Sequence, residues 1–172
     1  MSDDINREIR ELLDKQAIHE TLMRYCRGID RCDEELIRSA YHPGAYDDHG
    51  EFCGTAEEFV PWVLDALRRD GGMVTMHSIC NEYVEVRGDV AFGEAYFIAY
   101  HRSGPAGRQM DMTLGGRYVD RYERRGGQWK IARRTVLHDW TRVDPVDRTH
   151  DRIHLYKQGV RSREDESYRR DW

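Results

Sequence analysis

The chain has 172 residues, 39% of them hydrophobic and 34% charged, which fits one globular domain with a well-solvated surface. Its formal net charge of −5 argues against a general nucleic-acid-binding protein, because an acidic surface cannot neutralise a phosphate backbone. No apolar run approaches the roughly 18 residues that cross a bilayer, and the acidic N-terminus lacks the apolar stretch of a signal peptide. We therefore expect a cytoplasmic protein without nucleic-acid or membrane partners.

Residues 1–30 predict one long amphipathic helix. Apolar side chains recur at the spacing of helical turns, in the order Ile5, Ile9, Leu13, Ala17, Ile18, Leu22, Tyr25 and Ile29. Gly28 suits a C-terminal cap, and Asp33 is placed as the N-cap of a short second helix. His42-Pro43-Gly44 is expected to end that second helix before a short strand at 45–49.

Thr55-Ala56-Glu57-Glu58 has the form of a capping box and predicts a third helix, in which Pro61 indicates either a kink or a later start. Asp70-Gly71-Gly72 is expected to end it. From Met73 the hydrophobic period changes to two, and we expect strands at 74–86, 90–101, 110–123 and 128–140. The residues from about 141 to 172 predict a charged C-terminal extension that lies over the surface or over a neighbouring subunit. Three helices followed by antiparallel strands indicate one α+β domain over 1–172, with the helices packed on a curved sheet.

Two residues are candidates for acid–base chemistry. Asp30 falls at the end of the first helix, where the helix dipole disfavours an anion by roughly 0.3–1 kcal/mol, so it is either a functional carboxylate or a cap of the next helix. His77 lies in the first long strand, where a lone histidine is more often a packed core or surface residue than a catalyst. Tyr25 precedes Asp30 by a little over one helical turn, so both side chains can reach the mouth of one cavity.

Strand alternation divides the last strand into two faces. It places Arg134, Val136 and His138 on one face and directs the opposite face, with Trp129, Ile131 and Leu137, to the core. The face with Arg134, Val136 and His138 is then expected either to line a cavity or to be exposed to solvent.

A histidine and aspartate cluster in the first short strand suggests a metal site at first sight. Alternation puts Asp47 and His49 on one side of that strand, but no second group of ligands has a recognisable spacing. The four cysteines, Cys26, Cys32, Cys53 and Cys80, also lack a metal-binding spacing, so reduced thiols and no metal are expected.

With these features the chain resembles the SnoaL-like branch of the nuclear transport factor 2-like superfamily over nearly its whole length. The resemblance rests on the segments Tyr25–Asp33, His42–Ala45, Met76–Ser78 and Gly115–Lys130, the last of which is similar to a hairpin of hexachlorocyclohexane dehydrochlorinase. It implies a cone-shaped α+β barrel. Function is less tightly implied, because the superfamily mixes enzymes with binding proteins.

Members such as the dehydrochlorinase, bile acid 7α-dehydratase and scytalone dehydratase imply the roles of four residues here. The dehydrochlorinase and bile acid 7α-dehydratase pair an aspartate after the first helix with a histidine on the sheet, which matches Asp30 and His77. Asp30 would then hold the His77 ring while it takes a proton from carbon. Arg134 matches a pocket arginine of both and would stabilise negative charge on substrate oxygen. Tyr25 matches a tyrosine of the bile acid dehydratase and would donate to the leaving group.

The surroundings of this predicted site follow from strand parity and helix face. Expected pocket residues are Trp62, Phe97, His101, Met112, Leu114, Val136 and His138. At the middle-strand position where the dehydratase has an acidic residue, this chain has Ala99, Tyr100 or His101. The resemblance therefore does not predict which leaving group departs.

The function predicted is a cofactor-independent lyase, of the dehydratase type, acting on a small hydrophobic or ring-containing metabolite. One alternative is an isomerase or aldol-type cyclase in the same pocket. Another is a protein without chemistry, either a small-ligand binder or a partner subunit like the small chain of ring-hydroxylating dioxygenases. Because family members of the dehydratase kind form trimers, we expect a homo-oligomer, with a trimer favoured over a dimer.

Overall fold

The computed structural model of the chain describes every residue except 1, 70–72, 106, 148, 150–151 and 172. Its helices and long strands follow in the order α1 (Ser2–Arg31), α2 (Glu34–Ala40), β1 (Tyr41–Asp48), β2 (Cys53–Thr55), α3 (Ala56–Arg68), β3 (Val74–Arg87), β4 (Val90–Ser103), β5 (Met110–Arg125) and β6 (Gln128–Pro145). Two short 3-10 turns, η2 (Ile153–Leu155) and η3 (Glu166–Tyr168), lie in the C-terminal segment.

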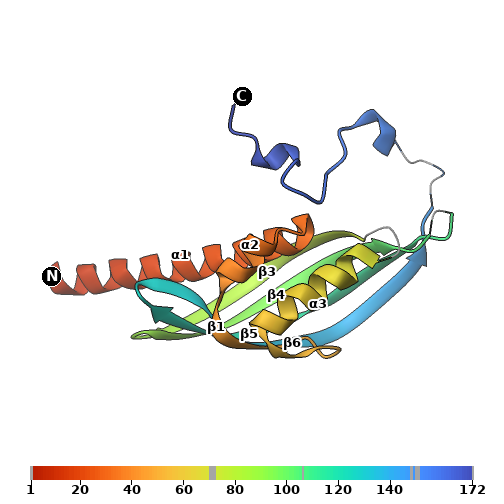
Figure 1. Cartoon of the computed structure of the whole chain (residues 1–172). Coiled ribbons are helices and arrows are strands. Elements are labelled where there is room, and N and C mark those ends of the chain that lie inside the picture. The colour runs from red at the N-terminus through yellow and green to blue at the C-terminus, as the bar shows by residue number, and fades with distance from the viewer. Residues whose placement is uncertain (1, 70–72, 106, 148, 150–151, 172) are drawn as a thin grey trace.

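The strands form one open, mixed sheet in the order β2-β1-β6-β5-β4-β3, and the three helices pack on it (Figure 1). Strand β1 runs parallel to β6, and every other neighbouring pair is antiparallel. The α+β class is therefore confirmed. Among the described residues, strand β3 pairs with β4 alone, which leaves its outer edge free for side-chain contacts from α1.

The long amphipathic helix is confirmed as α1, but only its second half is buried. Ile18, Leu22, Tyr25 and Ile29 pack into the core, whereas the apolar side chains of the first turns, from Ile5 to Leu13, are exposed. Figure 1 shows the reason, since the N-terminal turns of α1 extend past the sheet.

The end of α1 differs from the prediction in one detail. Gly28 lies inside the helix, where a Cβ would come within 2.8 Å of Ile37, so this glycine permits the close approach of α2. Cys32 takes the left-handed conformation instead, with φ of 49°. The N–H of Asp33 bonds the Gly28 carbonyl at 2.9 Å and that of Cys32 bonds the Ile29 carbonyl at 3.2 Å, which is the Schellman arrangement.

The other helix starts agree with the sequence. Asp33 caps α2 by accepting from the Leu36 N–H, and Thr55 and Glu58 form the predicted capping box of α3. Pro61 lies within α3, which begins at Ala56, so it does not delay the start of the helix. The predicted stop at Asp70-Gly71-Gly72 lies outside the described residues.

The strands are longer than predicted, and the predicted assignment of β6 residues to the two faces of the sheet is wrong. Tyr122 pairs with Ile131 but Arg121 pairs with Arg133, so Ala132 is an extra residue in β6. This bulge brings Trp129 and Ile131 to the same buried face as Arg134, rather than to the opposite face as expected. Strand β6 also continues to Pro145, so residues 141–145 belong to the sheet and not to the extension.

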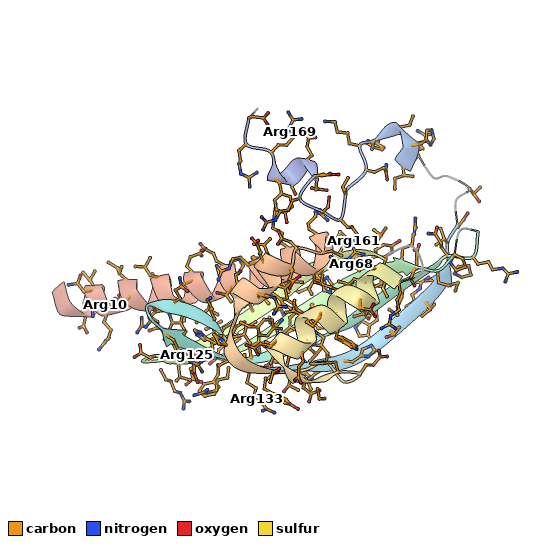
Figure 2. All side chains as sticks on the ribbon, in the orientation of Figure 1. Arg10, Arg68, Arg125, Arg133, Arg161 and Arg169 are labelled. Atoms are coloured by element: carbon orange, nitrogen blue, oxygen red, sulfur yellow. The ribbon has the colours of Figure 1, made fainter. Side chains whose placement is uncertain are left out.

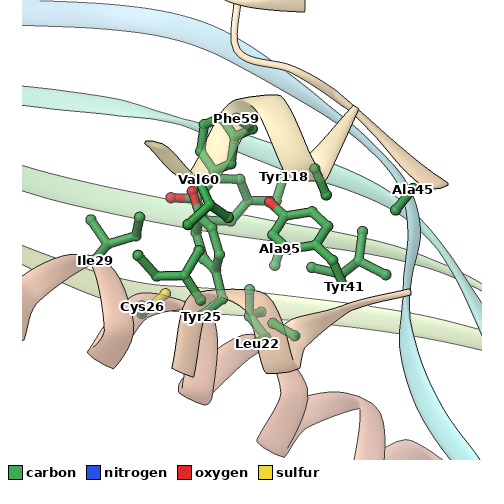
Figure 3. Packing of buried hydrophobic residues seen from close by; sticks show 14 of the residues in the cluster. Leu22, Tyr25, Cys26, Ile29, Tyr41, Ala45, Phe59, Val60, Ala95 and Tyr118 are labelled. Carbon is green, nitrogen blue, oxygen red and sulfur yellow. The ribbon is translucent and has the colours of Figure 1, made fainter. Parts of the chain in front are cut away.

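Aromatic side chains fill the core between the helices and the sheet (Figure 3). The Tyr25 ring of α1 meets the rings of Tyr41 and Tyr118 edge to face, with centroids 5.9 and 5.7 Å apart. Tyr118 in turn stacks on Phe97 at 4.5 Å. The side of this core nearest the end of α1 is where the candidate site begins.

Candidate functional site

The last turn of α1 presents Asp30 to the free edge of β3. The Asp30 Oδ2 atom accepts a hydrogen bond from the backbone N–H of His77 at 2.9 Å. An edge strand has backbone donors without a neighbouring strand, and here a side chain satisfies one of them. The contact fixes the position of His77 relative to the helix.

The Asp30 and His77 side chains form the predicted pair. His77 Nδ1 lies 2.7 Å from Asp30 Oδ1, which also accepts from the Thr75 hydroxyl at 2.9 Å. The two side chains are mostly enclosed, with 9% of His77 and 15% of Asp30 exposed. Burial alone raises the pKa of Asp30, but the hydrogen bonds and charge of His77 outweigh it, so the net pKa of Asp30 is lowered.

An ionised Asp30 can only accept hydrogen bonds, so His77 Nδ1 carries the proton that it shares with Asp30. In the neutral ring Nε2 then holds a free lone pair. No described residue hydrogen-bonds His77 Nε2, so this pair is oriented on one side and open on the other.

His101 is the middle-strand residue that faces this site. Its ring centroid lies 5.6 Å from that of His77, and its Nε2 atom is buried without a hydrogen-bond partner among the described residues. Burial, followed by the neighbouring His77, lowers the pKa of His101 to about 4. Ala99 shares the face but has no polar group, whereas the Tyr100 hydroxyl bonds Asp111 at 2.5 Å.

The remaining predicted pocket residues fall into two groups. Half-buried or buried positions with apolar side chains are Trp62, Phe97, Met112, Leu114 and Val136. Met112 and Leu114 pair with His101 and Ala99 across β4 and β5, which puts them on the His77 face. His138 differs, because it is exposed and its Nε2 atom contacts the Trp140 carbonyl at 3.0 Å.

Tyr25 belongs to a second aspartate–histidine pair. Asp47 is fully buried and accepts hydrogen bonds from the Tyr41 hydroxyl and from His49 Nδ1, as the shared strand face of Asp47 and His49 allows. The opposite His49 nitrogen, Nε2, lies 3.1 Å from the Tyr25 hydroxyl. Burial raises the pKa of Tyr25, so the hydroxyl is protonated and donates to His49.

Arg134 is fully buried and paired with Asp120. Its Nε and Nη2 atoms donate to the carboxylate at 2.8 and 2.6 Å, and its guanidinium lies 4.2 Å from the Tyr25 ring centroid and 4.1 Å from that of Tyr118. No hydrogen bond, ion pair or ring contact in the described part of the chain joins Arg134 or Tyr25 to Asp30 or His77. Their predicted roles in the reaction therefore stay predictions.

The sequence analysis missed three polar partners. Thr75 was identifiable in principle, because it lies two residues before His77 on the same strand face. Asp120 also left a signal, since a carboxylate alternates with Tyr118 and Tyr122 at buried positions. Arg161 had none, because it sits in a run of mixed charges in the tail.

The family model for the SnoaL-like domain matches residues 10–135 of the chain. The chain belongs to the SnoaL-like domain family. No curated protein sequence matches it. Solved structures that share the fold at low sequence identity include the following three. A protein from Novosphingobium aromaticivorans assigned as a scytalone dehydratase has a TM-score of 0.67 at 21% identity, covering 86% of this chain and 94% of the other.

The hexachlorocyclohexane dehydrochlorinase of Novosphingobium barchaimii has a TM-score of 0.65 at 19% identity, covering 84% of this chain and 97% of that enzyme. A protein from Kribbella flavida reaches 0.68 at 16% identity, with coverage of 77% and 95%. These likenesses establish the fold. In the described part of this SnoaL-like chain, no helix is both long and apolar enough to cross a membrane.

Proposed function

We propose that this SnoaL-like protein is a lyase of the dehydratase type. His77 removes a proton from carbon of a small hydrophobic or ring-containing metabolite, a leaving group departs from the neighbouring carbon, and no cofactor takes part. The observation that carries the proposal is the 2.7 Å contact between His77 Nδ1 and Asp30, combined with an Nε2 atom that no described residue hydrogen-bonds. A base positioned in this way contributes roughly 10²–10⁴-fold to a rate.

The proposed reaction balances within the pair. His77 Nε2 takes the proton, and the electrons of the broken C–H bond form the new double bond as hydroxide leaves the next carbon. The protonated His77 then returns the proton to the departing hydroxide, which gives water and restores the neutral ring. His101, which is neutral at pH 7 because its pKa is lowered to about 4, offers a hydrogen bond to the leaving oxygen.

The names of two structural neighbours support an elimination. One is assigned as a dehydratase and the other is a dehydrochlorinase, names that denote loss of water and of hydrogen chloride. The same base would move a double bond in a substrate that lacks a leaving group, which is the isomerase alternative. A homo-oligomer and a cytoplasmic location stay predictions.

The test compares proton exchange by the wild type, His77→Gln and His19→Gln. His19 is a matched control, because its Nδ1 also contacts a carboxylate, Glu82, at 2.7 Å, in a more exposed place on α1. Each protein is incubated in D₂O with cyclic ketones, β-hydroxy carbonyl compounds and phenolic alcohols, and NMR follows deuterium uptake and elimination.

We expect uptake or elimination with the wild type and His19→Gln, and a loss of roughly 10²–10⁴-fold with His77→Gln. Equal rates for wild type and His77→Gln would contradict the proposal. Binding of a compound without exchange by any of the three proteins would favour the small-ligand-binding alternative.

A further inference from the structure

The C-terminal tail, residues 152–171, returns to the end of α1 and the start of α2 (Figure 1). The Tyr168 hydroxyl donates to Asp33 at 2.8 Å, and the guanidinium of Arg27 lies 4.5 Å from the Tyr168 ring centroid. Arg163 of the tail pairs with the same Asp33 carboxylate at 3.1 Å. The tail lies outside residues 10–135, the range that the SnoaL-like model matches.

One tail residue, Arg161, which Figure 2 labels, contacts the site itself through Thr75. Its Nη2 atom donates to the Ile29 carbonyl at 3.2 Å and to the Thr75 hydroxyl at 3.4 Å. Thr75 in turn donates to Asp30, so one side chain separates the guanidinium from the carboxylate that holds His77. The positive charge of Arg161 also contributes to the lowered pKa of His101, after burial and His77.

The other two nitrogens of Arg161, Nε and Nη1, are buried without an oxygen or nitrogen acceptor among the described residues. The Cys32 side chain forms a weak hydrogen bond with this guanidinium. Burial lowers the pKa of this guanidinium, with Cys32 and Asp30 acting in the opposite direction. Buried donors without acceptors cost free energy, and a charged donor costs more than a neutral one.

The surface outside Arg161 is a groove of about 570 Å³ between the helix junction, the end of α3 and the tail. Its charged lining consists of Arg31, Asp33, Glu34, Glu35, Arg38, Arg68, Arg161 and Arg163. Arg31, Arg38 and Arg163 each form an ion pair with a carboxylate. Arg161 and Arg68 have no such ion pair in the described chain, which leaves their charges available to an anion.

We propose that Arg161 binds a carboxylate group of the substrate, so that the Asp30–His77 site takes an organic acid. This inference rests on the proposed function and narrows its substrate class. An oxygen of the carboxylate accepts a hydrogen bond from the guanidinium and compensates its charge. A hydrogen bond between charged groups is worth roughly 1.5–3 kcal/mol, which corresponds to about a ten- to hundred-fold change in affinity.

The experiment measures binding by calorimetry for three matched pairs of probes: benzoate and benzamide, cyclohexanecarboxylate and its amide, and 2-naphthoate and 2-naphthamide. Within each pair the ring is the same and the charge differs. The full chain is compared with Arg161→Gln, with Arg161→Lys, and with Arg163→Gln as a tail residue whose charge is already paired. His77→Gln is measured in parallel for binding and for exchange in D₂O.

We expect the wild type to prefer at least one carboxylate over its amide by about ten-fold or more, and Arg161→Gln to lose that preference. Arg161→Lys should keep part of it, while Arg163→Gln and His77→Gln should keep most of it. Absence of any carboxylate preference in the wild type, or its persistence in Arg161→Gln, would overturn the inference. Equal loss in Arg161→Gln and Arg163→Gln would also overturn it, because the effect would then belong to tail docking.

The two proposals fail separately. A carboxylate preference that depends on Arg161, with exchange unaffected by His77→Gln, would remove the lyase proposal and leave an acid-binding site. Loss of exchange in His77→Gln without any effect of Arg161→Gln on carboxylate binding would support the lyase proposal. It would contradict the inference that the substrate is an organic acid.

Discussion

Two aspartate–histidine pairs lie in the described part of this protein, and they differ in what the second ring nitrogen contacts. His49 shares one nitrogen with the buried Asp47 and the other with the Tyr25 hydroxyl at 3.1 Å, and its ring stacks on Phe59 at 4.6 Å. His77 shares one nitrogen with Asp30, and its other nitrogen has no partner in the described chain.

The comparison shows that an aspartate beside a histidine does not by itself indicate a base. A ring whose two nitrogens are both engaged stabilises the fold, because each polar group is satisfied in the core. A ring held on one side and free on the other retains a lone pair for a substrate proton. We therefore propose that the Asp47–His49 pair stabilises the fold and that the Asp30–His77 pair takes part in the reaction.

The largest expected difference between the pairs is in activity. Asp30→Asn should reduce turnover by roughly 10³–10⁴-fold, because an amide can donate to His77 Nδ1 and favour the tautomer that has a proton on Nε2. Steady-state kinetics on a substrate found by the exchange panel measures this. A loss of less than ten-fold would show that His77 does not need Asp30 as its orienting acceptor.

Asp47→Asn should act on stability instead. The buried carboxylate of Asp47 accepts hydrogen bonds from the Tyr41 hydroxyl and from His49 Nδ1. An asparagine keeps one acceptor oxygen, but its NH₂ group then faces the other donor. This mismatch should lower the free energy of unfolding by about 3 kcal/mol. Urea unfolding measures the change. An Asp47→Asn protein as stable as the wild type but inactive would reverse the assignment of the two pairs.

His101 gives a prediction in the dependence of stability on pH. Its pKa is about 4 in the folded protein and about 6.5 when unfolded, so between these values the unfolded chain binds more protons and stability falls as the pH falls. From pH 7 to pH 4 this single group should cost about 2–3 kcal/mol. His101→Gln should lose that part of the acid destabilisation, as measured by urea unfolding at both pH values. Equal slopes for the two proteins would contradict the burial of a neutral His101.

The smallest effect is expected for Tyr25→Phe. Removal of the hydroxyl leaves His49 Nε2 without its donor, which should cost about 1 kcal/mol in the free energy of unfolding. Activity should change by less than about ten-fold if Tyr25 acts only through His49. A loss of 10²-fold or more with unchanged stability would instead support the role of proton donor that the sequence predicted.

The sequence was sufficient for local features whose signal lies within a few residues. Capping residues such as Asp33 and Thr55 define helix starts directly, and the change of period at Met73 marks the sheet. The pairing of Asp30 with His77 was inferred from resemblance, since nothing local connects residues on a helix and on a strand.

Other features depend on packing that leaves no local pattern. The extra residue Ala132 in β6 inverted the expected faces, because alternation cannot show where a bulge falls. Arg134 was expected to face a pocket, yet Asp120 from the neighbouring strand pairs with it in the core. The docking of Arg161 depends on a chain reversal within a segment of mixed charge, which composition does not predict.

The most direct test of the central claim is the protonation state of each His77 nitrogen. A long-range ¹H–¹⁵N correlation spectrum of the labelled protein near pH 7 distinguishes the two neutral tautomers, with His77→Gln used to assign the signals. We predict a proton on Nδ1 and a free lone pair on Nε2, and a change of tautomer in Asp30→Asn. A proton on Nε2 in the wild type would contradict the account, since the nitrogen that faces the substrate would then be unable to act as the base.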